Sequence, residues 1–171
     1  MKLKPIGIIH SPFTGSAGTP IQPAFARGAE AHVEVFEQYQ DGLKDLEGFD
    51  RIWLLYWFHR ARKYRLRVTP YLDNFERGLF ATRAPSRPNP IGLSAVRLLG
   101  VEGNTLHVAD VDMLDGTPLL DIKPYTPRFD HLTVARSGWL DNVNPDRPCD
   151  DGRFADLDDD DERGGMRQDQ P

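Results

Sequence analysis

The chain has 171 residues, the size of a single domain with room for a tail, and its only cysteine, Cys149, excludes an internal disulfide and a cysteine metal cluster. We therefore expect a reducing, cytoplasmic compartment. We expect no signal peptide in residues 1–12, and the longest apolar run, residues 52–58, is too short to span a bilayer. The formal charge is −5, but residues 150–171 hold nine acidic and three basic residues, so residues 1–149 carry +1. This nearly neutral body neither requires nor excludes a nucleic-acid partner.

Short apolar segments at close spacing predict strands along most of the chain. Residues 31–36 alternate apolar and polar side chains, as a half-buried strand does, whereas residues 51–59 are continuously apolar, as a strand buried on both faces would be. The turn at Glu102-Gly103-Asn104 predicts a hairpin between its two flanking strands. The full set of predicted strands is 4–10, 31–36, 51–59, 64–69, 78–81, 92–101, 105–111 and 119–123.

Between these strands we expect a loop over residues 15–28, one or two helical turns over 38–46, and a weaker segment over 132–139. Many strands with little helix predict an all-β barrel or sandwich. We place the domain at residues 1–141. Residues 142–171 are rich in Asp, Pro, Gly and Arg, which predicts a disordered acidic tail that is solvated rather than a binding element.

The most unusual segment is the proline-rich stretch of residues 80–94. Three prolines fix the backbone and remove hydrogen-bond donors, so neither an ordinary helix nor a central strand is expected here. The same segment carries Arg83, Arg87 and Asn89. A rigid loop with cationic and amide side chains suits a polar ligand better than packing alone.

Two further segments are candidates for chemistry. His59 ends the aromatic strand and precedes Arg60, which indicates either a functional histidine or a plain strand end. Residues 112–118 form a predicted turn between two apolar strands, either an ordinary β-turn or a loop whose backbone faces a cleft. Asp121 and Lys123 lie on one strand face and could simply pair, and Tyr125 would either stack on a ring or pack at the rim.

The other histidines show no metal-ligand spacing, so no metal site is expected. The sequence also lacks GxGxxG, a P-loop, GxSxG, HExxH and CxxC. If the protein is an enzyme, its fold therefore lies outside the commonest nucleotide-binding classes.

At these motifs the sequence resembles the TsaA/TrmO family. Several long motifs in a fixed order make this a specific signal, and the resemblance covers about residues 4–130. The matching motifs are Pro5-Ile6-Gly7-Ile8-Ile9-His10-Ser11-Pro12, Leu46-Glu47-Gly48-Phe49, Trp57-Phe58-His59, Phe80-Ala81-Thr82-Arg83, Arg87-Pro88-Asn89-Pro90-Ile91-Gly92-Leu93-Ser94, Asp112-Met113-Leu114-Asp115-Gly116-Thr117-Pro118 and Asp121-Ile122-Lys123-Pro124-Tyr125.

The resemblance implies a small single-sheet β-barrel, usually a homodimer, that binds S-adenosyl-L-methionine. It implies methylation of N6 in threonylcarbamoyl-adenosine at tRNA position 37, so the expected partner is tRNA carrying that modification. The implied cofactor-binding residues are Gln22, Pro23, His59, Arg60, Arg83, Leu93, Asp112, Met113, Leu114, Asp115 and Gly116.

Two features depart from the longer family members. Those members carry an arginine where this chain has Ile21, and they carry an extra C-terminal domain thought to help hold tRNA, where this chain has an acidic tail that would repel phosphate. Cofactor binding is therefore the firmer expectation. The alternatives are a non-catalytic regulatory module that binds S-adenosylmethionine, and a methyltransferase with a different substrate. A basic face from Arg60, Arg62, Lys63, Arg65 and Arg67 would favour the RNA enzyme, unless it is only a solvated hairpin.

For the reaction itself we expect His59, Arg83 and Asp115 to be catalytic. Methyl transfer from a sulfonium is a direct displacement, so the enzyme mainly has to align the reacting atoms. A positioned base would help N6 to react, and His59 or Asp115 would orient or receive its proton. Arg83 and Arg87 would pair with the threonyl carboxylate or a phosphate, and structural pairing is the alternative for both. Arg87, Asn89 and Tyr125 are the expected substrate-binding residues.

Overall fold

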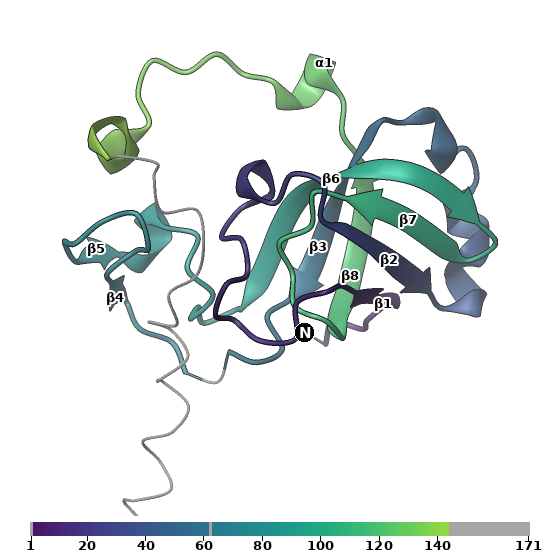
Figure 1. Cartoon of the computed structure of the whole chain (residues 1–171), viewed down its shortest axis with the longest axis horizontal. Coiled ribbons are helices and arrows are strands. Elements are labelled where there is room, and N and C mark those ends of the chain that lie inside the picture. Colours follow the sequence, from purple (N-terminus) through teal and green to yellow (C-terminus); the bar gives the residue numbers. More distant parts are fainter. Residues whose placement is uncertain (1, 62, 144–171) are drawn as a thin grey trace, which may run out of the picture.

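The computed structural model describes residues 2–61 and 63–143, so the predicted disorder of the tail at 144–171 lies outside the described residues. Six antiparallel strands close into a barrel in the order β1-β2-β7-β6-β3-β8 (Figure 1). The all-β prediction of a small single-sheet barrel is confirmed. The barrel strands are β1 (Gly7–His10), β2 (Glu30–Val35), β3 (Arg51–Trp57), β6 (Ile91–Glu102), β7 (Thr105–Ala109) and β8 (Thr117–Pro124).

The remaining elements are short. Between β3 and β6 a two-stranded sheet of β4 and β5 lies apart from the barrel (Figure 1), and after β8 the chain continues through α1 and a last 3₁₀ turn. These elements are η1 (Pro23–Phe25), η2 (Glu37–Leu43), η3 (Leu46–Gly48), β4 (Arg67–Val68), β5 (Arg77–Gly78), η4 (Leu79–Ala81), α1 (Pro127–Asp130) and η5 (Gly138–Asn142). Below, residues 60–90 are called the arm.

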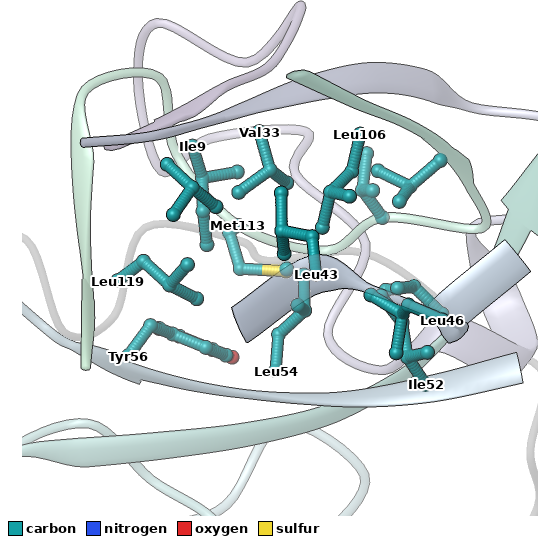
Figure 2. Close-up of a cluster of buried hydrophobic side chains, with 14 residues drawn as sticks. Ile9, Val33, Leu43, Leu46, Ile52, Leu54, Tyr56, Leu106, Met113 and Leu119 are labelled. Carbon is teal, nitrogen blue, oxygen red and sulfur yellow. The ribbon is translucent and has the colours of Figure 1, made fainter. Parts of the chain in front are cut away.

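The core fills the inside of the barrel, because alternate side chains of each strand point inward. Figure 2 shows this cluster, with Ile9, Val33, Leu106 and Leu119 gathered from four different strands. Met113, which follows β7, also inserts its side chain into the cluster. Leu43 and Leu46 come from the 3₁₀ turns between β2 and β3 and pack into the same core, so the predicted helical turns over 38–46 are present as η2 and η3.

The prediction that residues 51–59 are buried on both faces is wrong. Along β3 the residues alternate between buried and half-buried, since a closed barrel has one inner face and one outer face. Ile52, Leu54 and Tyr56 point into the core. The other face pairs in register with the outer face of β6, as Trp57 with Ile91 and Leu55 with Leu93. The sequence is continuously apolar because this outer face is apolar too.

Several predicted boundaries also differ. The predicted strand 64–69 is reduced to β4, and the predicted strand 78–81 is a 3₁₀ turn preceded by β5. Within residues 2–61 and 63–143, β4 and β5 pair only with each other, which limits their length. The first strand begins at Gly7 rather than residue 4. The strand predicted over 105–111 ends at Ala109, since Asp110 adopts a φ of 64° that leaves the extended conformation. Residues 132–137 form no strand, and η5 follows them.

Within residues 2–61 and 63–143, no helix has the length and apolar character that crossing a membrane requires.

Candidate functional site

The strand directions bring three loops to one end of the barrel. Thr117 begins β8 beside Ile9, which lies near the end of β1, and Trp57 ends β3 beside Ile91, which begins β6. The loop 11–29, the arm and the loop 110–116 therefore all leave the barrel at this end. We call it the upper end. Most of the residues expected to bind the cofactor lie in these three segments.

The loop 110–116 is fixed at its start by Asp110. One carboxylate oxygen of Asp110 accepts a hydrogen bond from the Gly28 N–H at 3.1 Å, and the other lies 2.9 Å from Nη2 of Arg51. Burial alone would raise the pKa of Asp110, but the Gly28 N–H and the Arg51 guanidinium hold it below its ordinary value. The chain thus enters the loop at a charged, hydrogen-bonded anchor.

The rest of the loop is tied to the segment that follows β1. The Ser11 hydroxyl donates to the Met113 carbonyl at 2.6 Å, and the Ser11 N–H donates to Asp115 Oδ1 at 3.2 Å. The Gly116 N–H donates to the Ile9 carbonyl at 3.0 Å, and Gly116 has a φ of 74°, which favours glycine. These bonds hold the loop in one conformation, as a binding loop requires.

A buried hydroxyl chain meets this loop at Asp112. Ser94 Oγ donates to Asp112 Oδ1 at 2.7 Å, and the Tyr56 hydroxyl lies 3.1 Å from Ser94 Oγ. Burial raises the pKa of Asp112 to about 6, although the Ser94 hydrogen bond and the nearby Arg83 charge lower it. Burial, and then the Asp112 charge, raises the pKa of Tyr56 well above its usual range. The arm's Arg83 therefore lies within electrostatic reach of both groups.

His59 stands beside the same loop. Its Nδ1 lies 3.4 Å from Thr117 Oγ1, and the Thr117 hydroxyl donates to the Leu114 carbonyl at 2.7 Å. Burial, followed by the charge of Arg60, lowers the pKa of His59 from its ordinary value. This shift favours the neutral form of His59 at pH 7. Arg60 itself donates to the Thr14 carbonyl at 2.8 Å and so ties the arm to the loop after β1.

Arg83 joins the arm to the loop 11–29 through a hydrogen bond from its Nη1 to Gln22 Oε1. Gln22 is the residue before η1, which begins at Pro23. The Gln22 side chain also donates to the carbonyl of Ile21, at 2.6 Å. Leu93 lies on the outer face of β6, 50% exposed, and so faces away from the core. The structure thus brings Gln22, Arg83 and the loop 110–116 to the upper end.

The three expected substrate-binding residues do not gather in one place. Arg87 turns inward on the arm: its Nη1 lies 3.1 Å from the Thr82 carbonyl, and its guanidinium lies over the Phe80 ring. Asn89 is near the start of β6, where its carbonyl accepts the Ile91 N–H. Tyr125 follows β8 at the opposite end of the barrel, with its ring 5.5 Å from that of Trp53.

Two side chains make contacts within the chain that the sequence had left open. Arg87 contacts the Thr82 carbonyl on the arm, and Lys123 pairs with Asp121 at 2.8 Å. An open groove of about 580 Å³ lies near Tyr125, at the lower end of the barrel, between η2, η3 and the end of β8. It is therefore separate from the upper-end cluster. Among the described residues, no three His, Cys, Asp or Glu side chains are placed to hold a metal ion.

Sequence reasoning missed the residues that hold the loop rather than line it. Ser11, Ser94 and Thr117 each supply a hydroxyl to the loop 110–116 or its side chains. A serine at an inward-facing position of an apolar strand was the available signal for Ser94. Nothing in the sequence pairs Ser11 with Met113, because that contact spans 102 residues.

The chain is similar to known proteins over most of its length. Residues 8–131 match the tRNA-methyltransferase O N-terminal domain. The chain is 54% identical over 156 residues to a probable S-adenosyl-L-methionine-binding protein of Pyrococcus abyssi, which covers 90% of this chain and 85% of that protein. It is 40% identical over 134 residues to the tRNA (adenine(37)-N6)-methyltransferase of Mus musculus, covering 74% of this chain and 31% of the mouse protein.

Solved structures agree with this match. The crystal structure of TrmO from Pseudomonas aeruginosa superposes with a TM-score of 0.69 at 40% identity, over 81% of this chain. The chain covers 62% of that protein's length and about a third of the mouse relative.

Proposed function

Because the chain belongs to the family of the tRNA-methyltransferase O N-terminal domain, we propose that it transfers a methyl group from S-adenosylmethionine to tRNA. The proposed target is N6 of threonylcarbamoyl-adenosine at position 37. The observation that carries this proposal is the assembly of Gln22, Arg83 and Asp112 at one end of the barrel, beside His59 and Asp115. A fold with no dinucleotide-binding loop thereby gains a preformed polar site.

The donor set at the upper end fits the chemistry of the cofactor. S-adenosylmethionine carries a cationic sulfonium and ammonium, a carboxylate, and an adenosine with polar edges; when bound, it supplies an activated methyl group. Asp112 and Asp115 offer carboxylates to the cationic groups, and Arg83 offers a guanidinium to the carboxylate. Gln22, already bonded to Arg83, adds an amide at the same place.

His59 is the group we propose to accept the proton of the target nitrogen. The Thr117 hydroxyl gives its only hydrogen to the Leu114 carbonyl, so the contact with Thr117 Oγ1 is one in which His59 Nδ1 donates. In this tautomer Nε2 carries the lone pair that can accept a proton. A lowered pKa keeps the ring neutral near pH 7, as a general base requires.

The arm supplies the charge that an RNA substrate needs. Residues 60–90 contain eight basic and two acidic residues, a formal charge of +6 within a body of +1. Phe75 and Phe80 stand 70% and 75% exposed on this arm, and guanidinium groups of Arg77 and Arg87 lie 5.8 Å and 5.7 Å from their rings. Exposed aromatic rings interleaved with arginines suit unpaired bases and phosphates.

We also propose that the protein is a homodimer. The outer face of β3 and β6 is an apolar stripe in which Trp57 faces Ile91 and Leu55 faces Leu93 across the two strands. Leu93 is half exposed although it lies in the middle of a strand pair. A continuous apolar stripe on the outside of a barrel suits association with a second copy.

A non-catalytic S-adenosylmethionine-binding module is the second candidate. A relative from Archaeoglobus fulgidus favours this candidate, because it is named an S-adenosyl-L-methionine-binding protein. The chain is 47% identical to that protein and covers 93% of its length, whereas it covers only 31% of the mouse methyltransferase.

The test is methyl transfer from labelled S-adenosylmethionine to two tRNA pools, one carrying threonylcarbamoyl-adenosine and one lacking it. Label only in the modified pool is the expected result. Label in both pools would retain the methyltransferase and reject the proposed target. No label in either pool, with cofactor binding confirmed in the same preparation, would favour the binding module.

A further inference from the structure

The interior of the barrel contains a polar path in an otherwise apolar core. Tyr56 and Ser94 are 4% and 2% exposed, and their hydroxyls lie among inward-facing Leu, Ile and Val side chains. Burying hydroxyls costs free energy that their hydrogen bonds only offset, and an apolar pair of similar shape would stabilise the core as well or better. Stability alone therefore does not account for this pair.

The direction of the path is set by the number of hydrogens available. The Ser94 hydroxyl has one hydrogen, and the acceptor at 2.7 Å is Asp112 Oδ1, which in its ionised form only accepts. The Tyr56 hydroxyl must then donate to Ser94 Oγ, at 3.1 Å. Each donation strengthens the next, so the two hydroxyls together stabilise a carboxylate rather than a carboxylic acid at Asp112.

The position of the Tyr56 ring is fixed by the facing strand. Tyr56 pairs in register with Gly92, where an added Cβ would lie 2.2 Å from the ring. The Phe58 ring meets it edge to face at 5.3 Å. The ring therefore has one place to lie, and its hydroxyl is held at Ser94.

We propose that Tyr56 and Ser94 are positioning residues of the cofactor site, and that their hydroxyl chain keeps the Asp112 carboxylate ionised and oriented to accept a cationic group of S-adenosylmethionine through Oδ2. This inference rests on the proposed function, since it requires the cofactor at the upper end. Ser94 occupies Oδ1, the backbone N–H of Asp112 itself also interacts with the carboxylate, and no side-chain hydrogen bond to Oδ2 is present within the described part of the chain. Among the described residues, Arg83 on the arm and Tyr56 on β3 are the charged and titratable groups that interact electrostatically with Asp112.

The experiment measures S-adenosylmethionine affinity by calorimetry between pH 5 and 8 for the full chain and for Ser94→Ala, Ser94→Thr and Tyr56→Phe. Ser86→Ala, at another buried serine, and Tyr39→Phe, at the lower end, are the matched controls. Thermal melts establish that each variant is folded. Measuring S-adenosylhomocysteine in parallel separates the two cationic groups, because that compound keeps the ammonium and lacks the sulfonium.

We expect the wild-type affinity to fall as the pH drops through about 6, where Asp112 becomes protonated. Ser94→Ala removes a hydrogen bond to the carboxylate, so its midpoint should rise by roughly one to two pH units, with about two- to tenfold weaker binding at pH 7. Tyr56→Phe should shift the midpoint less, and Ser94→Thr should restore it. If Ser94→Ala weakens the binding of both S-adenosylmethionine and S-adenosylhomocysteine, the ammonium is the group that Asp112 accepts. If it weakens the binding of S-adenosylmethionine alone, that group is the sulfonium. Either result supports the proposal.

A Ser94→Ala protein that is folded and keeps the wild-type affinity and midpoint would overturn this inference and leave the proposed function intact. A wild-type chain that binds no S-adenosylmethionine at any pH would overturn both.

Discussion

Replacing Gly92 by alanine tests the central contact between the core and the site. An alanine Cβ would lie 2.2 Å and 2.3 Å from two atoms of the Tyr56 ring, about 1.2 Å short of the 3.4 Å at which ordinary contact begins. The ring cannot absorb this by rotating into free space, because it is buried, packed edge to face on Phe58 and hydrogen bonded at its hydroxyl. Either the ring or the β3–β6 pairing has to move.

The expected cost follows from that displacement. Overpacking a core typically costs about 1–3 kcal/mol, and losing the Tyr56–Ser94 hydrogen bond adds about 0.5–1.5 kcal/mol. The sum is about 1.5–4.5 kcal/mol of unfolding free energy. For a domain of this size each kcal/mol lowers the melting temperature by about 2–4 °C, so we expect a decrease of roughly 3–18 °C.

The assay is a thermal melt, followed by S-adenosylmethionine titration well below the transition. Gly100→Ala is the matched control, because Gly100 lies on the same strand and an added Cβ there meets nothing within 4 Å. Gly92→Ala should melt lower than the control and bind the cofactor more weakly. If the two variants share one melting temperature, the packing argument is refuted; if only the affinity is unchanged, the link from Tyr56 to the cofactor site fails.

Three other changes are informative. Asp110→Asn keeps a residue type that tolerates the left-handed backbone but removes the charge that meets Arg51, so the free energy of unfolding should fall by about 1–3 kcal/mol at pH 7. Because the pKa of Asp110 is depressed in the folded state, this loss should be full above the unfolded pKa near 4 and should vanish as the pH falls through the folded pKa. A difference in denaturant midpoint that does not depend on pH would contradict this prediction. Arg83→Ala should abolish methyl transfer with little change in melting temperature, and an unchanged rate would remove its assigned role. Leu55→Asp should convert the proposed dimer to a monomer in light scattering while Leu99→Asp, 47% exposed farther along β6, should not; an unchanged mass for Leu55→Asp would place the interface elsewhere.

Most of the barrel was predictable from local patterns. Alternation marked residues 31–36, and the turn at Gly103 marked the β6–β7 hairpin, because side-chain period and turn chemistry are local properties. The arm was predicted poorly. Its strands have two residues each, and they pair through Val68 with Arg77 and Arg67 with Gly78. Their extent therefore depends on contacts between residues nine and eleven positions apart rather than on an amphipathic run.

The residues of the candidate site also differ in how far the sequence could predict their place. His59, Arg83 and Asp112 were identified from motifs, and the structure brings the segments that carry them to one end of the barrel. Arg87 and Tyr125 have the same residue types as a binding site but make internal contacts on the arm and at the lower end. Residue type states what a side chain can do, whereas its neighbours decide what it does.

The sequence by itself determined that the chain forms a small all-β domain, which segments form the strands of the barrel, and which loops carry ionisable side chains. Only the tertiary structure decided that Ser11 holds Met113 and that Ser94 holds Asp112, contacts that span 102 and 18 residues. It also decided that one face of β3 remains apolar outside the barrel. The physical reason is closure: joining β1 to β8 fixes which side chains face inward and which loops share an end, and no local pattern contains that information.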